Sequence, residues 1–143
     1  MSKLGQIREL HSAGIAFGSH THTHPQLLNI PRAVVTQELR RSKNIIEDKL
    51  GSAVTDFSYP YYFPEENSIF KAFISDELMN AGYLRSVTTI IGRHNAGESE
   101  IFMRRLPVNS EDDNEFFDAK LNGSYDWLRR SQYIVKKVRS VIR

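Results

Sequence analysis

The chain has 143 residues, of which 40% are hydrophobic and 25% charged, and its net charge of +2 is that of an ordinary globular protein. We expect residues 1–143 to form a single domain, because this length allows one core of useful size. The absence of cysteine excludes disulfides, thiolate metal sites and cysteine nucleophiles. No apolar run approaches the roughly 20 residues that span a bilayer, and the N-terminus lacks a signal-peptide pattern, so the default expectation is a cytoplasmic protein.

The first half of the chain alternates between helix and strand patterns. Residues 3–13 predict a short helix that Ser2 caps and Gly14 ends, and residues 15–19 predict a buried strand that stops at a cluster of histidines. A longer helix is expected from Pro31 to Gly51. The apolar sides of these two helices comprise Leu4, Ile7 and Leu10 in the first and Val35, Leu39, Ser42, Ile45, Ile46 and Leu50 in the second.

The second half continues the alternation. Residues 53–60 predict a strand that Pro60 terminates, and residues 83–91 and 101–108 predict two more. Helices are expected over residues 66–81, 114–121 and 124–142. The inward side chains would be Ile69, Phe70, Phe73, Ile74 and Leu78 in the first of these helices and Tyr125, Leu128, Val135, Val138 and Ile142 in the last.

Strands that alternate with helices indicate an α/β fold with a mostly parallel sheet and a C-terminal helix. In such sheets the loops after the carboxyl ends of the strands meet at one edge, where sites form. Four loops are therefore expected at the same edge: His20–Pro25, Pro60–Pro64, Gly92–Glu100 and Asn109–Asp113.

The loop His20–Pro25 contains three of the five histidines, His20, His22 and His24. In a helical turn the first and third of them would share a face, and in an extended segment all three would point the same way. Two imidazoles can therefore converge on one ion, and zinc accepts imidazole nitrogen readily. The alternative is a polar loop whose Ser, Thr and His side chains satisfy one another's hydrogen bonds.

Several segments, in order and spacing, resemble the polysaccharide deacetylase family, also called the NodB-homology domain or carbohydrate esterase family 4. These segments are "GIAFGSHTHTHPQL", "ELRRSKNIIEDKLG", "FSYPYY", "AGYLRSVTT", "RRLPV" and "LNGSYDWLRR". The resemblance implies an irregular (β/α) barrel and hydrolysis of N-acetyl groups on amino-sugar polymers, or of acetyl esters, with a divalent metal that is commonly zinc. A carbohydrate of that class would be the substrate.

The resemblance also implies roles for individual residues. His20 and His24 match the two metal-binding histidines of an H-[S/T]-x-x-H motif, in which Thr21 fills the Ser/Thr position and His22 a variable one. The segment Tyr59, Pro60 and Tyr61 matches a substrate-binding loop, and the backbone at Tyr61 would help hold the oxyanion. Aromatic packing at the end of a strand is the alternative for these tyrosines.

The chain also departs from the family pattern. It lacks the first strand with its Asp-Asp motif, which supplies the general base and a third metal ligand, so we expect an incomplete barrel. Ser58 stands where many members have Arg, Tyr62 stands where Gly often follows the tyrosine, and the late Leu-x-His motif of the general acid has no clear match. Two histidines alone would hold zinc weakly.

Other residues could substitute for the absent carboxylates. Glu111, Asp112 and Asp113 follow a strand and are expected at the same edge as the histidines, although they could instead form a solvated loop or cap the next helix. His94 is a further candidate ligand or acid. Asp56 would lie on the order of 13 Å from that edge and is too far.

An incomplete barrel exposes a sheet edge, which a homodimer, another partner or the terminal helix could cover. Three functions stay open: a metal-dependent deacetylase whose site a partner could complete, an inactive fragment that binds carbohydrate or metal weakly or mediates assembly, and a binding module built on the terminal helix. That helix carries six basic residues and one acidic residue after position 123. Without aromatic interleaving it predicts a solvated helix face more than nucleic-acid or anionic-membrane binding.

Overall fold

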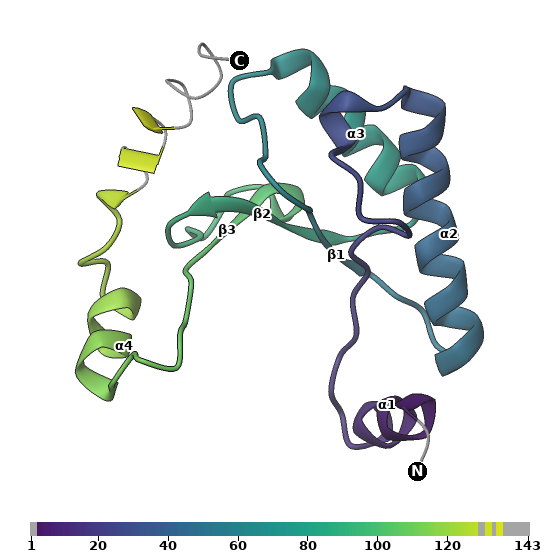
Figure 1. The fold of residues 1–143 in the computed structure, drawn as a ribbon, viewed down its shortest axis with the longest axis horizontal. Helices are drawn as coiled ribbons and strands as arrows, with labels where there is room; N and C mark the ends of the chain where they lie inside the picture. Colours follow the sequence, from purple (N-terminus) through teal and green to yellow (C-terminus); the bar gives the residue numbers. More distant parts are fainter. Residues whose placement is uncertain (1–2, 129–130, 133, 136–143) are drawn as a thin grey trace.

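A computed structural model describes residues 3–128, 131–132 and 134–135 (Figure 1). It confirms the prediction of an α/β fold with a parallel sheet. The helices are α1 (Lys3–Ser12), α2 (Arg32–Leu50), α3 (Ser68–Asn80) and α4 (Asn114–Leu121), with 3-10 helices η1 (Leu27–Asn29) and η2 (Glu100–Phe102). The strands are β1 (Asp56–Ser58), β2 (Arg85–Ile91) and β3 (Met103–Arg105).

The sheet has the order β1-β2-β3, and both pairs are parallel. Burial alternates along β2, so that Ser86 and Thr88 are buried on the same face as Ile90. The two buried hydroxyls donate hydrogen bonds to the carbonyls of Ile101 and Met103, next to and within β3. These bonds remove the free-energy cost of burying polar groups and join the central strand to its neighbour.

One hydrophobic core joins the sheet to α2 and α3 (Figure 1). Val35 and Leu39 of α2 and Ile74 of α3 are fully buried in it. The buried Tyr83, which precedes β2, donates its hydroxyl proton to the carbonyl of Leu39 and so ties α2 to the sheet. The other buried apolar members are Leu27, Val54, Phe57, Tyr59, Phe63, Phe70, Leu78, Ile90 and Ile101.

The segment 15–19 differs from the predicted buried strand. Ser19 forms a single parallel bridge with Phe57, through hydrogen bonds from Ser19 N–H to Asp56 O and from Ser58 N–H to Ser19 O. Ile15 is 51% exposed, because no neighbouring strand covers the outer side of this segment in the described part of the chain. Gly18 is required there, since a β-carbon at that position would lie 3.0 Å from the Asp56 carbonyl oxygen.

Other expectations were wrong in detail. The strands β1 and β3 are shorter than predicted, and Ile69 of α3 is 71% exposed although its periodicity placed it inward. In α1, Ile7 and Leu10 are largely exposed, and contacts between α1 and the end of α2 include the hydrogen bond from Arg8 to the Lys49 carbonyl. The helix predicted from residue 124 is not yet formed at Tyr125, which lies in a turn.

Parts of the predicted terminal helix lie outside the described residues. Helical backbone is found at Leu128, 131–132 and 134–135. Val138, Ile142 and all six basic residues after position 123 lie outside the described ranges, as does the predicted cap Ser2.

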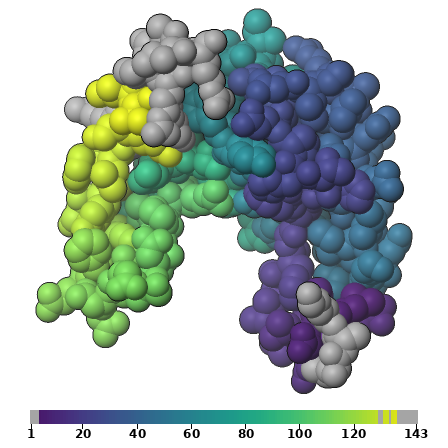
Figure 2. Space-filling view, viewed as in Figure 1, coloured from purple at the N-terminus to yellow at the C-terminus, as the bar shows by residue number. Residues whose placement is uncertain are grey.

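The described chain forms an arch. Figure 1 places α1 beside the end of α2 and places α4 on the opposite side of the sheet, and Figure 2 shows a hollow between these two limbs. No helix in the described ranges combines the length and the apolar character needed to cross a bilayer.

The core predicts a contrast between two isoleucines of α3. Ile74 is fully buried and Ile69 is 71% exposed. We expect Ile74→Ala to lower the free energy of unfolding by about 2–5 kcal/mol, because the substitution leaves a cavity. Ile69→Ala should change it by no more than about 0.5 kcal/mol. Urea denaturation of both variants measures the difference, and equal effects would contradict the placement of α3.

Candidate functional site

The histidine loop starts beside the end of β1. Pairing of Ser19 with Phe57 brings His20 next to Ser58, the last residue of β1. The Nδ1 atom of His20 lies 2.6 Å from the carbonyl oxygen of Ser58. A carbonyl can only accept a hydrogen bond, so this contact requires the tautomer with the proton on Nδ1. In the neutral ring, Nε2 of His20 therefore carries a lone pair, which can accept a hydrogen bond from Nε2 of His24 in the metal-free protein or bind a metal.

The ring of His24 faces this lone pair. The Nε2 atoms of His20 and His24 are 3.1 Å apart, and the ring planes meet at 65°. Two imidazole nitrogens bound to one zinc ion at about 2.0–2.1 Å and near the tetrahedral angle would be about 3.3 Å apart. The spacing therefore fits two ligands of a single ion. His22 is also exposed, and its ring makes no contact with the other two in the described residues.

The second loop of the site contributes Tyr61. Its ring lies 4.5 Å from that of His24, centroid to centroid, and its side chain is 49% exposed. Tyr59 and Pro60 differ from the expectation that they contact substrate, because both are buried in the core. Tyr59 packs edge-on against Phe63, and burial raises its pKa above the ordinary value. Of the three expected contacts, Tyr61 alone offers its side chain to a ligand.

Backbone conformation sets these two loops apart. Thr21, His24 and Tyr61, with φ of 67°, 58° and 55°, are the non-glycine residues with positive φ in the described chain. The left-handed region costs an L-residue roughly 1–2 kcal/mol. Such conformations persist where surrounding contacts impose them, and they gather at functional sites. All three lie in the His20–Pro25 and Pro60–Pro64 loops.

A carboxylate from α2 supports the histidine loop. Glu38 is 7% exposed and accepts hydrogen bonds from the backbone N–H groups of His22 and Thr23 and from the Thr23 hydroxyl. Burial would raise the pKa of Glu38, but these hydrogen bonds outweigh it and hold that pKa below the ordinary value. The sequence analysis did not single out Glu38. A usable signal was present, since Glu38 lies on the apolar face of its helix between Val35 and Ser42.

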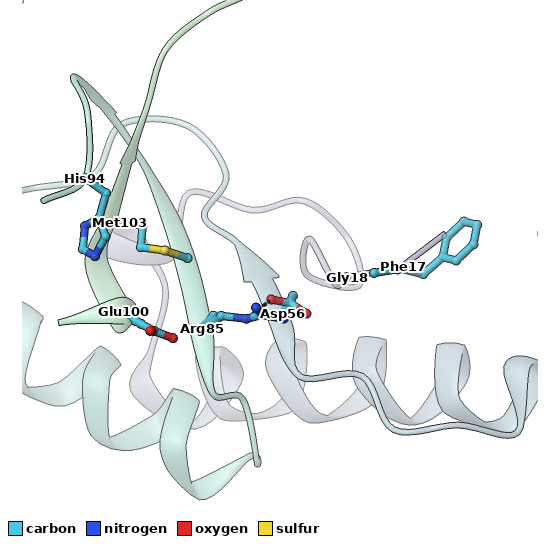
Figure 3. Close-up of a pocket in the computed structure, with 8 residues that line it drawn as sticks. Phe17, Gly18, Asp56, Arg85, His94, Glu100 and Met103 are labelled. Carbon is cyan, nitrogen blue, oxygen red and sulfur yellow. Dashed lines mark hydrogen bonds and ion pairs between the residues drawn. The ribbon is translucent and has the colours of Figure 1, made fainter. Parts of the chain in front are cut away.

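His94 does not join the other histidines. It lines a cavity of about 420 Å³ together with Asp56, Arg85 and Met103, the first residues of the three strands (Figure 3). Its Nδ1 atom is buried, lies 3.4 Å from a carboxylate oxygen of Glu98, and has no hydrogen-bond partner in the described chain. The expectation that His94 shares an edge with His20 was therefore wrong, because the loop after β2 folds back toward the starts of the strands.

The acidic residues at positions 111–113 form contacts with nearby residues. Asp112 forms an ion pair with Lys120 of α4 and accepts a hydrogen bond from the backbone of Asn109. Asp113 caps α4 by accepting from the N–H of Phe116. The neighbouring Glu111 accepts only a long, 3.4 Å contact from Ser110. The capping alternative for this trio is thus the one observed, and α4 stands across the sheet from α2 (Figure 1).

The donor set is consequently limited. In the described residues, no group of three or more His, Cys, Asp and Glu side chains could hold a metal ion. His20 and His24 fit two imidazole ligands of one ion, and a third protein ligand does not come from this part of the chain.

The comparisons with known proteins concern the family and the fold. A family model described as polysaccharide deacetylase matches residues 2–72. Among solved structures, the deacetylase PplD of Streptococcus pyogenes in complex with acetate aligns with a TM-score of 0.72 at 22% identity, over 83% of this chain and 50% of that one. No curated protein matches the chain.

Two further structures show the same fold. The deacetylase domain of BpsB from Bordetella bronchiseptica aligns with a TM-score of 0.60 at 19% identity, over 74% of this chain and 48% of that one. A de-N-acetylase from Aggregatibacter actinomycetemcomitans gives 0.60 at 16% identity, over 82% and 52%. The chain thus has the fold of these deacetylases and spans about half their length.

The contact with Ser58 predicts the tautomer of His20. In metal-free protein we expect the neutral ring of His20 to carry its proton on Nδ1, because the Ser58 carbonyl lies 2.6 Å away. Long-range ¹H–¹⁵N correlation spectra distinguish the two nitrogens. His22, which is exposed, serves as the internal reference. A His20 ring protonated on Nε2 would contradict the geometry.

The loop after β2 gives a prediction about pH. Hydrogen bonds from Asn95 and Arg104 lower the pKa of Glu98 to about 2. A carboxylate with a lowered pKa stabilises the fold above its unfolded-state pKa and loses that effect as pH falls toward the folded value. The stability difference between wild type and Glu98→Gln should therefore shrink as the pH falls from about 5 to about 2. Chemical denaturation across this range measures it, and a constant difference would contradict the ion pair.

Proposed function

Residues 2–72 belong to the polysaccharide deacetylase family, and we propose from this premise that the chain contributes the metal-binding histidines and the oxyanion loop of a metal-dependent deacetylase. Its substrate would be an amino-sugar polymer that carries N-acetyl groups. The observation that supports the proposal most directly is the 3.1 Å approach of the two Nε2 atoms, with the His20 tautomer set by Ser58.

His20 and His24 would hold the ion, and zinc is the metal that this nitrogen donor set favours. When bound, a zinc ion polarises an acyl carbonyl and lowers the pKa of a coordinated water toward neutrality. The chain's own residues orient the pair: the Ser58 carbonyl holds the ring of His20, and the ring of Tyr61 packs against His24.

Tyr61 would act on the substrate side. Its amide N–H donates to no acceptor in the described chain. Its φ of 55° differs from the extended conformation of the preceding strand. A free backbone N–H beside the metal can stabilise the oxyanion that forms on the acetyl carbonyl. The exposed ring offers an apolar face to a sugar.

The site needs a further ligand and a general base. We propose that carboxylates from outside the described residues supply them, either from another stretch of polypeptide or from a partner such as a second copy that covers the exposed side of residues 15–19. The half-length alignment with solved deacetylases supports this view, because their remaining halves have no counterpart here.

A second candidate function is an inactive module that binds carbohydrate or metal weakly or mediates assembly. The lack of a three-ligand group in the described residues favours it. Metal affinity separates the two candidates, because two imidazoles alone bind zinc much more weakly than a complete site does.

Zinc titration by calorimetry tests the proposal. If a second copy of the chain supplies the missing ligand, we expect a Kd tighter than about 1 μM, roughly −8 kcal/mol, that His20→Ala and His24→Ala each abolish. His22→Ala is the matched control, because it removes an exposed imidazole from the same loop, and it should leave the Kd unchanged. Binding near 1 mM, or binding that the two variants do not alter, would instead support the inactive module.

Acetate release from N-acetylglucosamine oligomers tests the reaction itself. If a second copy of the chain completes the site, the protein should release acetate with zinc present, and His20→Ala should abolish the release because a ligand is lost. The absence of turnover with zinc, cobalt and nickel would contradict an enzyme that acts without a partner.

A further inference from the structure

The carboxylate of Glu38, on α2, binds the middle of the histidine loop. One oxygen, Oε2, accepts from the N–H of His22 at 2.8 Å and from that of Thr23 at 2.7 Å. The other oxygen, Oε1, accepts from the Thr23 hydroxyl at 2.7 Å. All three donors therefore belong to the two residues between Thr21 and His24.

These hydrogen bonds explain how a carboxylate is tolerated on the buried face of α2. Glu38 forms no ion pair with a lysine or arginine in the described part of the chain, so backbone and hydroxyl donors balance its charge. Hydrogen bonds to an ionised acceptor are stronger than those between neutral groups. All three hydrogen bonds come from the histidine loop, so the Glu38 carboxylate restrains that loop directly.

The loop needs such support because of its backbone. Thr21 and His24, on either side of the Glu38 contacts, both have positive φ. Without a tertiary restraint each would relax toward the ordinary negative-φ regions, which would rotate the His24 ring away from His20. The restraint and the strain lie within five consecutive residues, 20–24.

We propose that Glu38 is a positioning residue that holds residues 21–24 in the conformation in which the imidazoles of His20 and His24 converge. The role of the converged pair in binding metal rests on the proposed function, whereas the convergence itself does not. Glu38 touches neither ring and acts through the backbone of His22 and Thr23.

The test uses the whole chain without metal. The ring centroids of His20 and His24 are 4.8 Å apart, close enough for a nuclear Overhauser effect between ring protons. Glu38→Ala should abolish this effect and weaken zinc binding about 10- to 100-fold, the usual loss on removing an outer-shell partner. Glu38→Gln should restore both, because its amide oxygen can accept from the two N–H groups while its amide nitrogen donates to the Thr23 hydroxyl.

Glu47→Ala is the matched control. Glu47 lies on the same helix and also accepts a backbone hydrogen bond, from Val54 N–H, but makes no contact with the histidine loop in the described chain. It should lower the melting temperature while leaving the ring–ring effect and the zinc affinity unchanged. Should Glu38→Ala not fold, Glu38→Asp keeps the charge but cannot reach the loop, and the same losses are expected of it.

Two results would overturn the inference. One is a ring–ring effect that survives in Glu38→Ala or Glu38→Asp, and the other is an equal loss in Glu47→Ala. If wild-type protein bound no zinc at all, the proposed function would fail, but the comparison of ring contacts in metal-free protein would still decide the role of Glu38.

Discussion

Parallel pairing with β1 is the interaction on which the site depends. Two backbone hydrogen bonds join Ser19 to the segment Asp56–Ser58, so that the segment ending at Ser19 and β1 run parallel. The loops that follow them must then emerge at the same edge, which brings His20 and His24 into contact with Ser58 and Tyr61. Gly18 permits this pairing, because any side chain there would press on Asp56.

Buried polar side chains of α2 bind both Ser19 and the loop that follows it. Ser19 shares a hydrogen bond of 2.7 Å with Ser42, and Glu38 lies one turn earlier on the same side of α2. One helix therefore anchors both the start of the histidine loop and its middle. Buried polar groups with specific partners define one arrangement more sharply than apolar packing does, since a shifted register would leave them unpaired.

The arrangement also explains what the described chain can and cannot do. It offers two imidazoles with the spacing of metal ligands, one oriented by a backbone carbonyl, and an exposed aromatic residue beside them. Carboxylates that could have served as ligands make other contacts: Glu38 binds the histidine loop, Asp112 pairs with Lys120 and Asp113 caps α4. The outer side of residues 15–19 carries the exposed Ile15, so this is where an additional segment could pair.

The sequence by itself determined the order of helices and strands, the parallel sheet and the histidine pair, because these follow from local periodicity, from capping residues such as Gly51 and from a short motif. It also identified the edge at which His20 and Tyr61 meet. Only the tertiary structure decided that His94 turns toward the starts of the strands, that Tyr59 packs in the core, and that Glu38 holds the histidine loop. These outcomes depend on contacts between residues distant in sequence, and no local pattern specifies which donor a buried carboxylate will meet.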